Sequence, residues 1–148
     1  MSEPQEIVPI GKNDLVGMVA HLFAEGYRLV QIGCSTLQGG YELNYSFDKD
    51  YRFKNLRMTV APDEEVPSIS AIYPNAFLYE NEIHDLFGLL VKDIAIDYGG
   101  SLYRTAIKTP FSIGNVKFSE PPKPKAESSP QQKEKPKDEA EIPEGQKE

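Results

Sequence analysis

Two runs of alternating apolar and polar residues on either side of Gly39-Gly40 constrain the fold of this chain more than any other feature. In the second run, residues 41–47, every other side chain is apolar: Tyr41, Leu43, Tyr45 and Phe47. The first run, residues 27–37, has one side formed by Arg28, Val30, Ile32, Cys34 and Thr36. Alternation predicts half-buried strands, and paired glycines favour a tight turn. We therefore predict a hairpin.

A third strand and a helix complete the first half of the chain. Residues 48–50 form a turn and residues 51–61 return as a strand, whose apolar phase shifts near Asn55 and predicts a bulge there. Before the hairpin, residues 12–26 show helical spacing of apolar residues, with Asn13 as N-cap and Gly26 as the stop. A helix followed by a three-stranded antiparallel meander predicts an α+β domain.

Composition excludes several classes of function. The net charge of −7 argues against a nucleic-acid-binding protein, because phosphate is bound by basic surfaces. The single cysteine, Cys34, excludes an intrachain disulfide and a cysteine-built cluster on this chain. No stretch approaches the length and apolarity needed to span a bilayer. We expect any membrane association to come through a partner.

The composition changes near Ser119. Residues 119–148 are rich in Pro, Lys and Glu, contain no aromatic residue, and cannot bury enough apolar surface to order themselves. We predict one α+β domain over residues 1–118 and a disordered or extended tail over residues 119–148. A tail that docks along a neighbouring protein is the alternative.

The stretch from Tyr73 to Leu90 predicts a second helix, begun by Asn75 after Pro74. Its apolar residues fall on one stripe, which we expect to cover the sheet: Ala76, Tyr79, Ile83, Leu86, Phe87 and Leu90. Among its polar residues we expect Glu80 at the edge of the stripe beside His84. Asn81 and Asp85 should form an exposed line on the opposite side.

Three roles are open to this polar cluster. A catalytic zinc helix needs two histidines one turn apart, and His84 is alone. Acid–base work by Glu80 or Asp85 would need a pocket that the sequence does not indicate. Carboxylates presented from a packed helix can instead pair with a partner's arginines. The pattern favours docking, through Glu80, Glu82, His84, Asp85, Gly88 and Arg104, with no catalytic, cofactor-binding or metal-binding residue on this chain.

The stretch VPSISAIYPNAFLYENEIHDLFGL resembles the signature of the thirty-kilodalton subunit of respiratory complex I. The positions that match are Pro67, Ser68, Ile69, Pro74, Glu80, Glu82, Asp85, Leu86, Phe87 and Gly88. The helix and strands upstream follow the order of that family, so that the resemblance covers roughly residues 10–95.

Three positions depart from the family pattern. Asn81 stands where the family usually has arginine, Ile94 stands at a histidine and Tyr98 at a further arginine. The continuation DYGGSLYR instead resembles the version in energy-converting, membrane-bound nickel–iron hydrogenases and related complexes.

The resemblance implies a non-catalytic subunit of the hydrophilic arm of a membrane-bound, ion-pumping oxidoreductase. Its expected partners are a large subunit, which carries the nickel–iron site or forms a quinone pocket, and a small iron–sulfur subunit. Iron–sulfur clusters and the nickel–iron centre would lie on those partners. The expected location is the cytoplasmic face of the cell membrane, as a peripheral protein.

The resemblance favours a ferredoxin-dependent hydrogenase. The same role in an NADH–quinone or sulfur-reducing relative of complex I is the first alternative. A free-standing adaptor that binds through the acidic helix and the tail belongs to a different class. A small enzyme that uses Glu80, Glu82, His84 and Asp85 is the third alternative.

Overall fold

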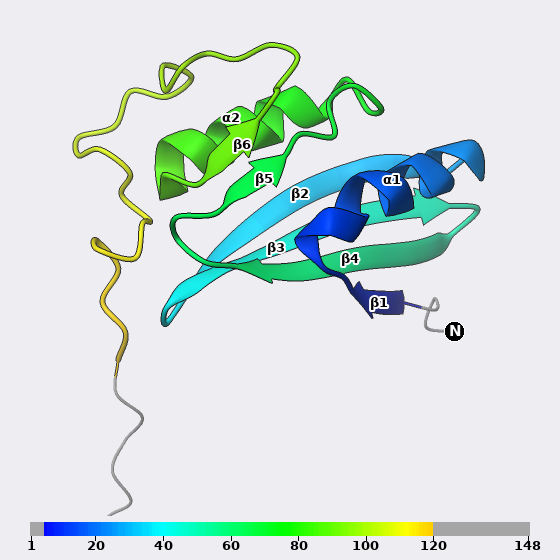
Figure 1. The fold of residues 1–148 in the computed structure, drawn as a ribbon, viewed down its shortest axis with the longest axis horizontal. Coiled ribbons are helices and arrows are strands. Elements are labelled where there is room, and N and C mark those ends of the chain that lie inside the picture. The colour runs from blue at the N-terminus through cyan, green and yellow to red at the C-terminus, as the bar shows by residue number, and fades with distance from the viewer. Residues whose placement is uncertain (1–4, 120–148) are drawn as a thin grey trace, which may run out of the picture. The chain divides into compact units, whose positions relative to one another are not determined.

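A four-stranded sheet forms the base of the domain (Figure 1). The computed structural model describes residues 5–119. Strands β2 (Arg28–Leu37), β3 (Gly40–Lys49) and β4 (Arg52–Val60) make the antiparallel meander that the sequence predicts. Strand β1 (Gln5–Pro9), which the sequence analysis does not predict, pairs in parallel with β4 and makes the order β1-β4-β3-β2.

Both α-helices lie on the same face of this sheet (Figure 1). Helix α1 (Leu15–Ala24) follows a single 3₁₀ turn, η1 (Lys12–Asp14), so that Asp14 and not Asn13 occupies its N-cap position. Gly26 follows the end of α1 with a φ of +86°, a conformation that glycine adopts at little cost. No helix among residues 5–119 is long and apolar enough to cross a membrane.

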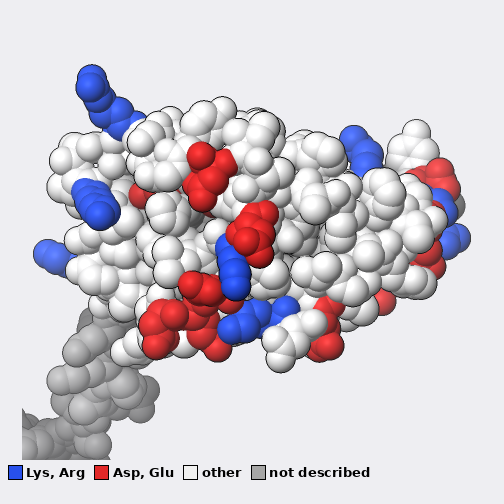
Figure 2. All heavy atoms as spheres, turned by 45° about the horizontal axis from the view of Figure 1, so that its top comes forward, with Lys and Arg blue, Asp and Glu red and all other residues white. Residues whose placement is uncertain are grey.

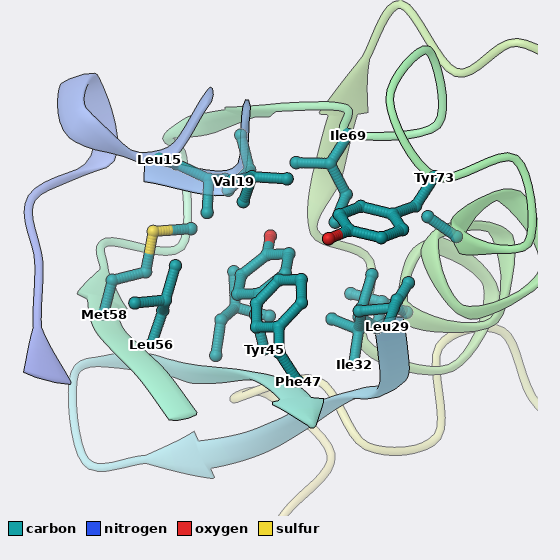
Figure 3. Close-up of a cluster of buried hydrophobic side chains, with 14 of the residues drawn as sticks. Leu15, Val19, Leu29, Ile32, Tyr45, Phe47, Leu56, Met58, Ile69 and Tyr73 are labelled. Carbon is teal, nitrogen blue, oxygen red and sulfur yellow. The ribbon is translucent and has the colours of Figure 1, made fainter. Parts of the chain in front are cut away.

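The alternation in β3 sets the core. The four apolar side chains of residues 41–47 are each at most 3% exposed. They point toward the helices, and on the same face of the sheet they lie beside buried side chains of β4, including Leu56 and Met58 (Figure 3). Leu15 and Val19 of α1 are fully buried over them. Burial of this apolar surface drives folding of the domain.

The predicted bulge near Asn55 is wrong. Pairing of β3 with β4 runs without a shift past Asn55, whereas the register shift lies in β2, between Leu29 and Gln31. Asn55 is buried on the sheet face away from the helices, where its amide donates to Asn44 Oδ1 at 2.8 Å. Because the pairing is unbroken, Phe53 lies on the same sheet face as Asn55, away from the helices, and the apparent change of phase arises because Phe53 and Leu56 lie on opposite faces.

Helix α2 (Ala76–Phe87) packs against β2 beside a small second sheet, in which β5 (Glu65–Pro67) pairs in parallel with β6 (Leu90–Lys92). The helix ends at Phe87. Leu90 is therefore 48% exposed on β6 and does not belong to the helical stripe, whereas Leu89 is fully buried.

Residues 93–118 contain no helix or strand. This segment continues from β6 past α2 and contacts the β2–β3 hairpin, where Tyr41 Oη accepts the Ile113 N–H at 3.2 Å. We call residues 93–118 the irregular segment. The predicted tail, residues 119–148, lies outside the described residues except for Ser119.

Candidate functional site

Glu80 of α2 points into the protein. Its side chain is 1% exposed, and its two carboxylate oxygens accept different donors: Ser68 Oγ at 2.6 Å and the Ile69 N–H at 2.7 Å. Both donors follow directly after β5. Glu80 therefore fixes the connection between the small sheet and α2.

Burial raises the pKa of Glu80 above its ordinary value, and the hydrogen bonds from Ser68 and Ile69 oppose that shift with a smaller effect. Burial disfavours the charged carboxylate, whereas donors stabilise it. Because the Glu80 side chain is almost fully buried, its remaining lone pairs are closed to a substrate or a partner.

Ser70 extends this network to the irregular segment. Because the Ser68 hydroxyl donates to Glu80, the Ser70 hydroxyl, 2.7 Å from Ser68 Oγ, donates to Ser68. Ser70 Oγ in turn accepts the Ala95 N–H at 2.8 Å. The first turn of the irregular segment is thus tied to α2 through two serines.

Asn81 forms hydrogen bonds to the next residues of the irregular segment, Ile96 and Tyr98. Its amide nitrogen donates to Ile96 O at 2.8 Å and to Phe77 O at 2.7 Å, and its amide oxygen accepts the Tyr98 N–H at 2.9 Å. The side chain is 1% exposed. The expectation that Asn81 is exposed is therefore wrong, because the irregular segment covers that side of α2.

Asp85 is likewise buried, at 9% exposure, and the expectation that it is exposed is wrong. One carboxylate oxygen accepts the Tyr103 N–H at 2.8 Å, and the other lies 3.5 Å from His84 Nδ1. His84 itself is partly exposed.

Glu82 and Arg104 are more open to solvent. The Tyr103 hydroxyl donates to Glu82 Oε2 at 3.2 Å, and this contact raises the pKa of Tyr103. Arg104 is exposed and forms no ion pair within residues 5–119.

The end of α2 also meets the irregular segment. Gly88 has a φ of +77°, and a Cβ there would lie 3.1 Å from Thr109 Cγ2. Two residues on, the Phe111 N–H donates to Leu86 O at 2.8 Å, which satisfies a carbonyl in the last turn of the helix. Gly88 is therefore required by backbone conformation and by close packing.

Together, these residues hold a backbone that has no regular structure of its own. Buried N–H groups need acceptors, and side chains of α2 supply several of them here. Residues 5–119 contain no group of three His, Cys, Asp or Glu side chains that could hold a metal ion. The geometry is that of a structural clamp, which we call the α2 clamp: Ser68, Ser70, Glu80, Asn81 and Asp85.

The sequence predicts only part of the clamp. Glu80 and Asp85 are among its candidate site residues, whereas Ser68, Ser70 and Asn81 are not, and Ser70 and Asn81 bind the irregular segment directly. The available signal is the segment itself: it has no periodicity, so its backbone groups must find partners outside regular structure.

The profile of the family described as respiratory-chain NADH dehydrogenase, 30 Kd subunit, matches residues 8–95. The chain belongs to this family. The match ends where the irregular segment begins to be tied to Ser70 and Asn81, so that most of that segment lies beyond it.

Curated relatives agree with the family. The C-type subunit of the NADH-quinone oxidoreductase of Parvibaculum lavamentivorans is 35% identical over 71 residues, which are 43% of this chain and 36% of the relative. Its counterpart in Cereibacter sphaeroides is 29% identical over 109 residues, 64% of this chain and 53% of the relative. A combined C/D-type protein of the same species is 50% identical over 38 residues, 26% of this chain and 7% of the relative. The chain therefore spans only part of the length of these relatives.

A solved structure shares the fold. It is the membrane-bound sulfane sulfur reductase, described as an archaeal respiratory membrane complex. One of its chains aligns with a TM-score of 0.57 at 19% identity, covering 66% of this chain and 61% of that chain. The likeness supports the α+β arrangement described above.

Proposed function

We propose that this protein is a non-catalytic, hydrophilic subunit of a complex I-type membrane oxidoreductase, and that it binds the D-type large subunit. Membership of the 30 Kd subunit family supports the first part. The C/D-type relative, whose name joins the two subunit types in one protein, supports the second part. Two subunits that a relative fuses are expected to lie side by side.

The single observation that supports a structural role is that the carboxylates of the α2 clamp are hydrogen-bonded within the protein itself. The carboxylates of Glu80 and Asp85 accept hydrogen bonds from the protein's own backbone and from a serine hydroxyl. A catalytic carboxylate needs a free oxygen facing a pocket and a substrate. These groups instead fix the conformation of a surface to which a partner binds.

We assign the six predicted docking residues two different tasks. The exposed or partly exposed side chains of Glu82, His84 and Arg104 contact the large subunit directly. Glu80, Asp85 and Gly88 act indirectly, because they hold the segments that surround those side chains.

We propose more specifically that the complex is a ferredoxin-dependent nickel–iron hydrogenase. The resemblance of residues 97–104, DYGGSLYR, to the hydrogenase version supports this. The nickel–iron centre and the iron–sulfur clusters would lie on the large and small partner subunits. The protein would be peripheral at the cytoplasmic face of the membrane, held there by its partners.

A sulfur-reducing complex is the second candidate. The observation that favours it is the shared fold with a chain of the sulfane sulfur reductase complex. In that case the same docking role holds, whereas the product of the assembled complex changes.

Purification of the full chain from solubilised membranes of its own organism tests both the docking role and the type of complex. We expect the D-type large subunit and the small iron–sulfur subunit to co-purify in equal amounts with the tagged chain. A lone small species on gel filtration would refute the docking role. Hydrogen evolution from reduced ferredoxin by the purified complex would support the hydrogenase, and sulfide production without hydrogen would favour the second candidate.

A further inference from the structure

The irregular segment exposes a row of large apolar side chains. Each is between 43 and 56% exposed: Ile96, Tyr98, Tyr103, Ile107, Phe111 and Phe118. Scattered apolar residues are ordinary on a protein surface, but six within one segment form a feature that needs an explanation. We call the exposed side of residues 96–118 the apolar strip.

The charges of the strip differ from those of the whole chain. Residues 96–118 contain three basic residues, Arg104, Lys108 and Lys117, and one acidic residue, Asp97, whereas the chain has a net charge of −7. All three basic residues are exposed. Figure 2 shows that uncharged residues make up most of the face brought forward from the top of Figure 1, and that Lys and Arg near its lower edge lie beside Asp and Glu. The strip is thus apolar, with spaced positive charges.

The backbone of the strip is fixed before any partner binds. Three of its N–H groups are held by α2: Tyr98 by Asn81, Tyr103 by Asp85 and Phe111 by the Leu86 carbonyl. In addition, the Tyr98 ring stacks on Phe77 at a centroid distance of 6.4 Å. Ordering a flexible loop weakens association, and a segment already held in place avoids that loss.

We infer that the apolar strip is the surface on which the large subunit of the proposed complex docks, and that the large subunit presents an apolar groove bordered by carboxylates. This inference rests on the proposed function and adds the location and chemistry of the contact. Burial of the exposed aromatic and aliphatic side chains supplies affinity. The carboxylates complement Arg104, Lys108 and Lys117, which would otherwise lose solvation without an ion-pairing group.

An anionic lipid surface fits the strip less well. Asp97 is exposed at the start of the strip, and Glu82 lies against the Tyr103 hydroxyl. An anionic membrane would repel these two carboxylates, whereas a protein groove can place donors opposite them. Charge complementarity therefore favours a protein partner.

The apolar part of the inference is tested with two matched isoleucines. Ile107 is 56% exposed on the strip, and Ile7 is 52% exposed on β1, on the sheet face away from the helices. Binding of each full-length variant to the purified large subunit is measured by biolayer interferometry, with a melting curve alongside. We expect Ile107→Ser to weaken binding by about tenfold or more without lowering the melting temperature, and Ile7→Ser to bind as the wild type does. Equal binding by both variants would overturn the apolar part.

The charged part is tested with Arg104→Glu and the control Arg52→Glu, in which Arg52 is exposed at the β3–β4 turn. We expect Arg104→Glu to slow association and to reduce its dependence on salt, because a charge pair at the rim acts mainly on the rate of encounter. Identical salt dependence in the two variants would overturn the carboxylate border.

Two controls separate this inference from the proposed function. If the wild-type chain fails to bind the large subunit at all, the proposed function fails and the inference fails with it. If the wild type binds and the strip variants bind equally well, only the inference fails. Binding of the wild type to phosphatidylglycerol vesicles, with loss of that binding in Arg104→Glu and no binding to the large subunit, would overturn the protein partner in favour of a membrane.

Discussion

The Asp85 carboxylate accepts the backbone N–H of Tyr103 at 2.8 Å, across 18 residues of sequence and from a side chain that is 9% exposed. This contact reverses what the helical pattern of α2 predicts for Asp85. Its consequence is that changes at this position affect the fold of the irregular segment first and any partner contact second.

Asp85→Ala should therefore destabilise the protein, because it leaves the Tyr103 N–H without its acceptor. We expect a loss of about 1–3 kcal/mol in the free energy of unfolding. Asp85→Asn should cost less, since its amide oxygen can still accept. Hydrogen exchange at the Tyr103 amide, measured by NMR, should accelerate in the alanine variant. Unchanged exchange there would contradict the clamp.

Glu80→Gln should change how stability depends on pH. Burial raises the pKa of Glu80 in the folded protein above its ordinary value of 4.5, so that the folded state binds a proton more tightly than the unfolded chain. The wild type therefore loses stability from this group as the pH rises from 4.5 to the folded pKa.

Glu80→Gln removes the ionisable group, so the variant does not lose stability from this position as the pH rises. The difference in unfolding free energy, variant minus wild type, should grow as the pH rises through that window and then level off. Urea unfolding at a series of pH values between about 4 and 8 measures it. Parallel curves for the two proteins would show that Glu80 has the same proton affinity in both states.

Tyr41→Phe tests the contact between the β2–β3 hairpin and the irregular segment. The Tyr41 hydroxyl donates to Phe87 O at 2.9 Å and accepts the Ile113 N–H at 3.2 Å, and its side chain is 3% exposed. Removal of the hydroxyl should cost about 1–3 kcal/mol of unfolding free energy, because the Phe87 carbonyl and the Ile113 N–H, both partly buried, lose a partner. Tyr79→Phe is the matched control: it removes one hydrogen bond, to Val30 O at 3.1 Å in an exposed setting, and should cost less. Equal melting temperatures for the two variants would argue against this contact between the hairpin and the irregular segment.

Two glycine substitutions should act in opposite directions. Gly88→Ala forces alanine into a φ of +77° and places its Cβ 3.1 Å from Thr109 Cγ2, so we expect a loss of at least about 1–2 kcal/mol. Gly17→Ala lies within α1 and its Cβ would meet nothing within 4 Å, so we expect a gain of about 0.5–1 kcal/mol. Thermal unfolding of both variants checks the two signs. A stabilised Gly88→Ala protein would mean that the end of α2 is free to rearrange.

The sequence by itself determined the meander, the two helices and the core that they share. The alternation from Tyr41 to Phe47 is a local pattern with one solution: a strand whose apolar side faces the core. Gly26, which the sequence predicts as the stop of the first helix, likewise follows α1 in a conformation that glycine accepts with little strain. Local spacing suffices for such features because the residues that decide them are neighbours in the chain.

The tertiary structure alone decided what lies against the polar residues of α2. Helical spacing places Asn81 and Asp85 opposite the apolar stripe, and solvent is the ordinary neighbour of that side. Here the neighbour is the irregular segment, whose own sequence shows no periodicity that would predict its path. Backbone N–H groups outside regular structure require other acceptors. The Tyr98 N–H donates to the Asn81 side chain and the Tyr103 N–H donates to the Asp85 side chain. A pairing between residues 17 or 18 positions apart, made by a side chain and a backbone group, leaves no periodic trace in a sequence.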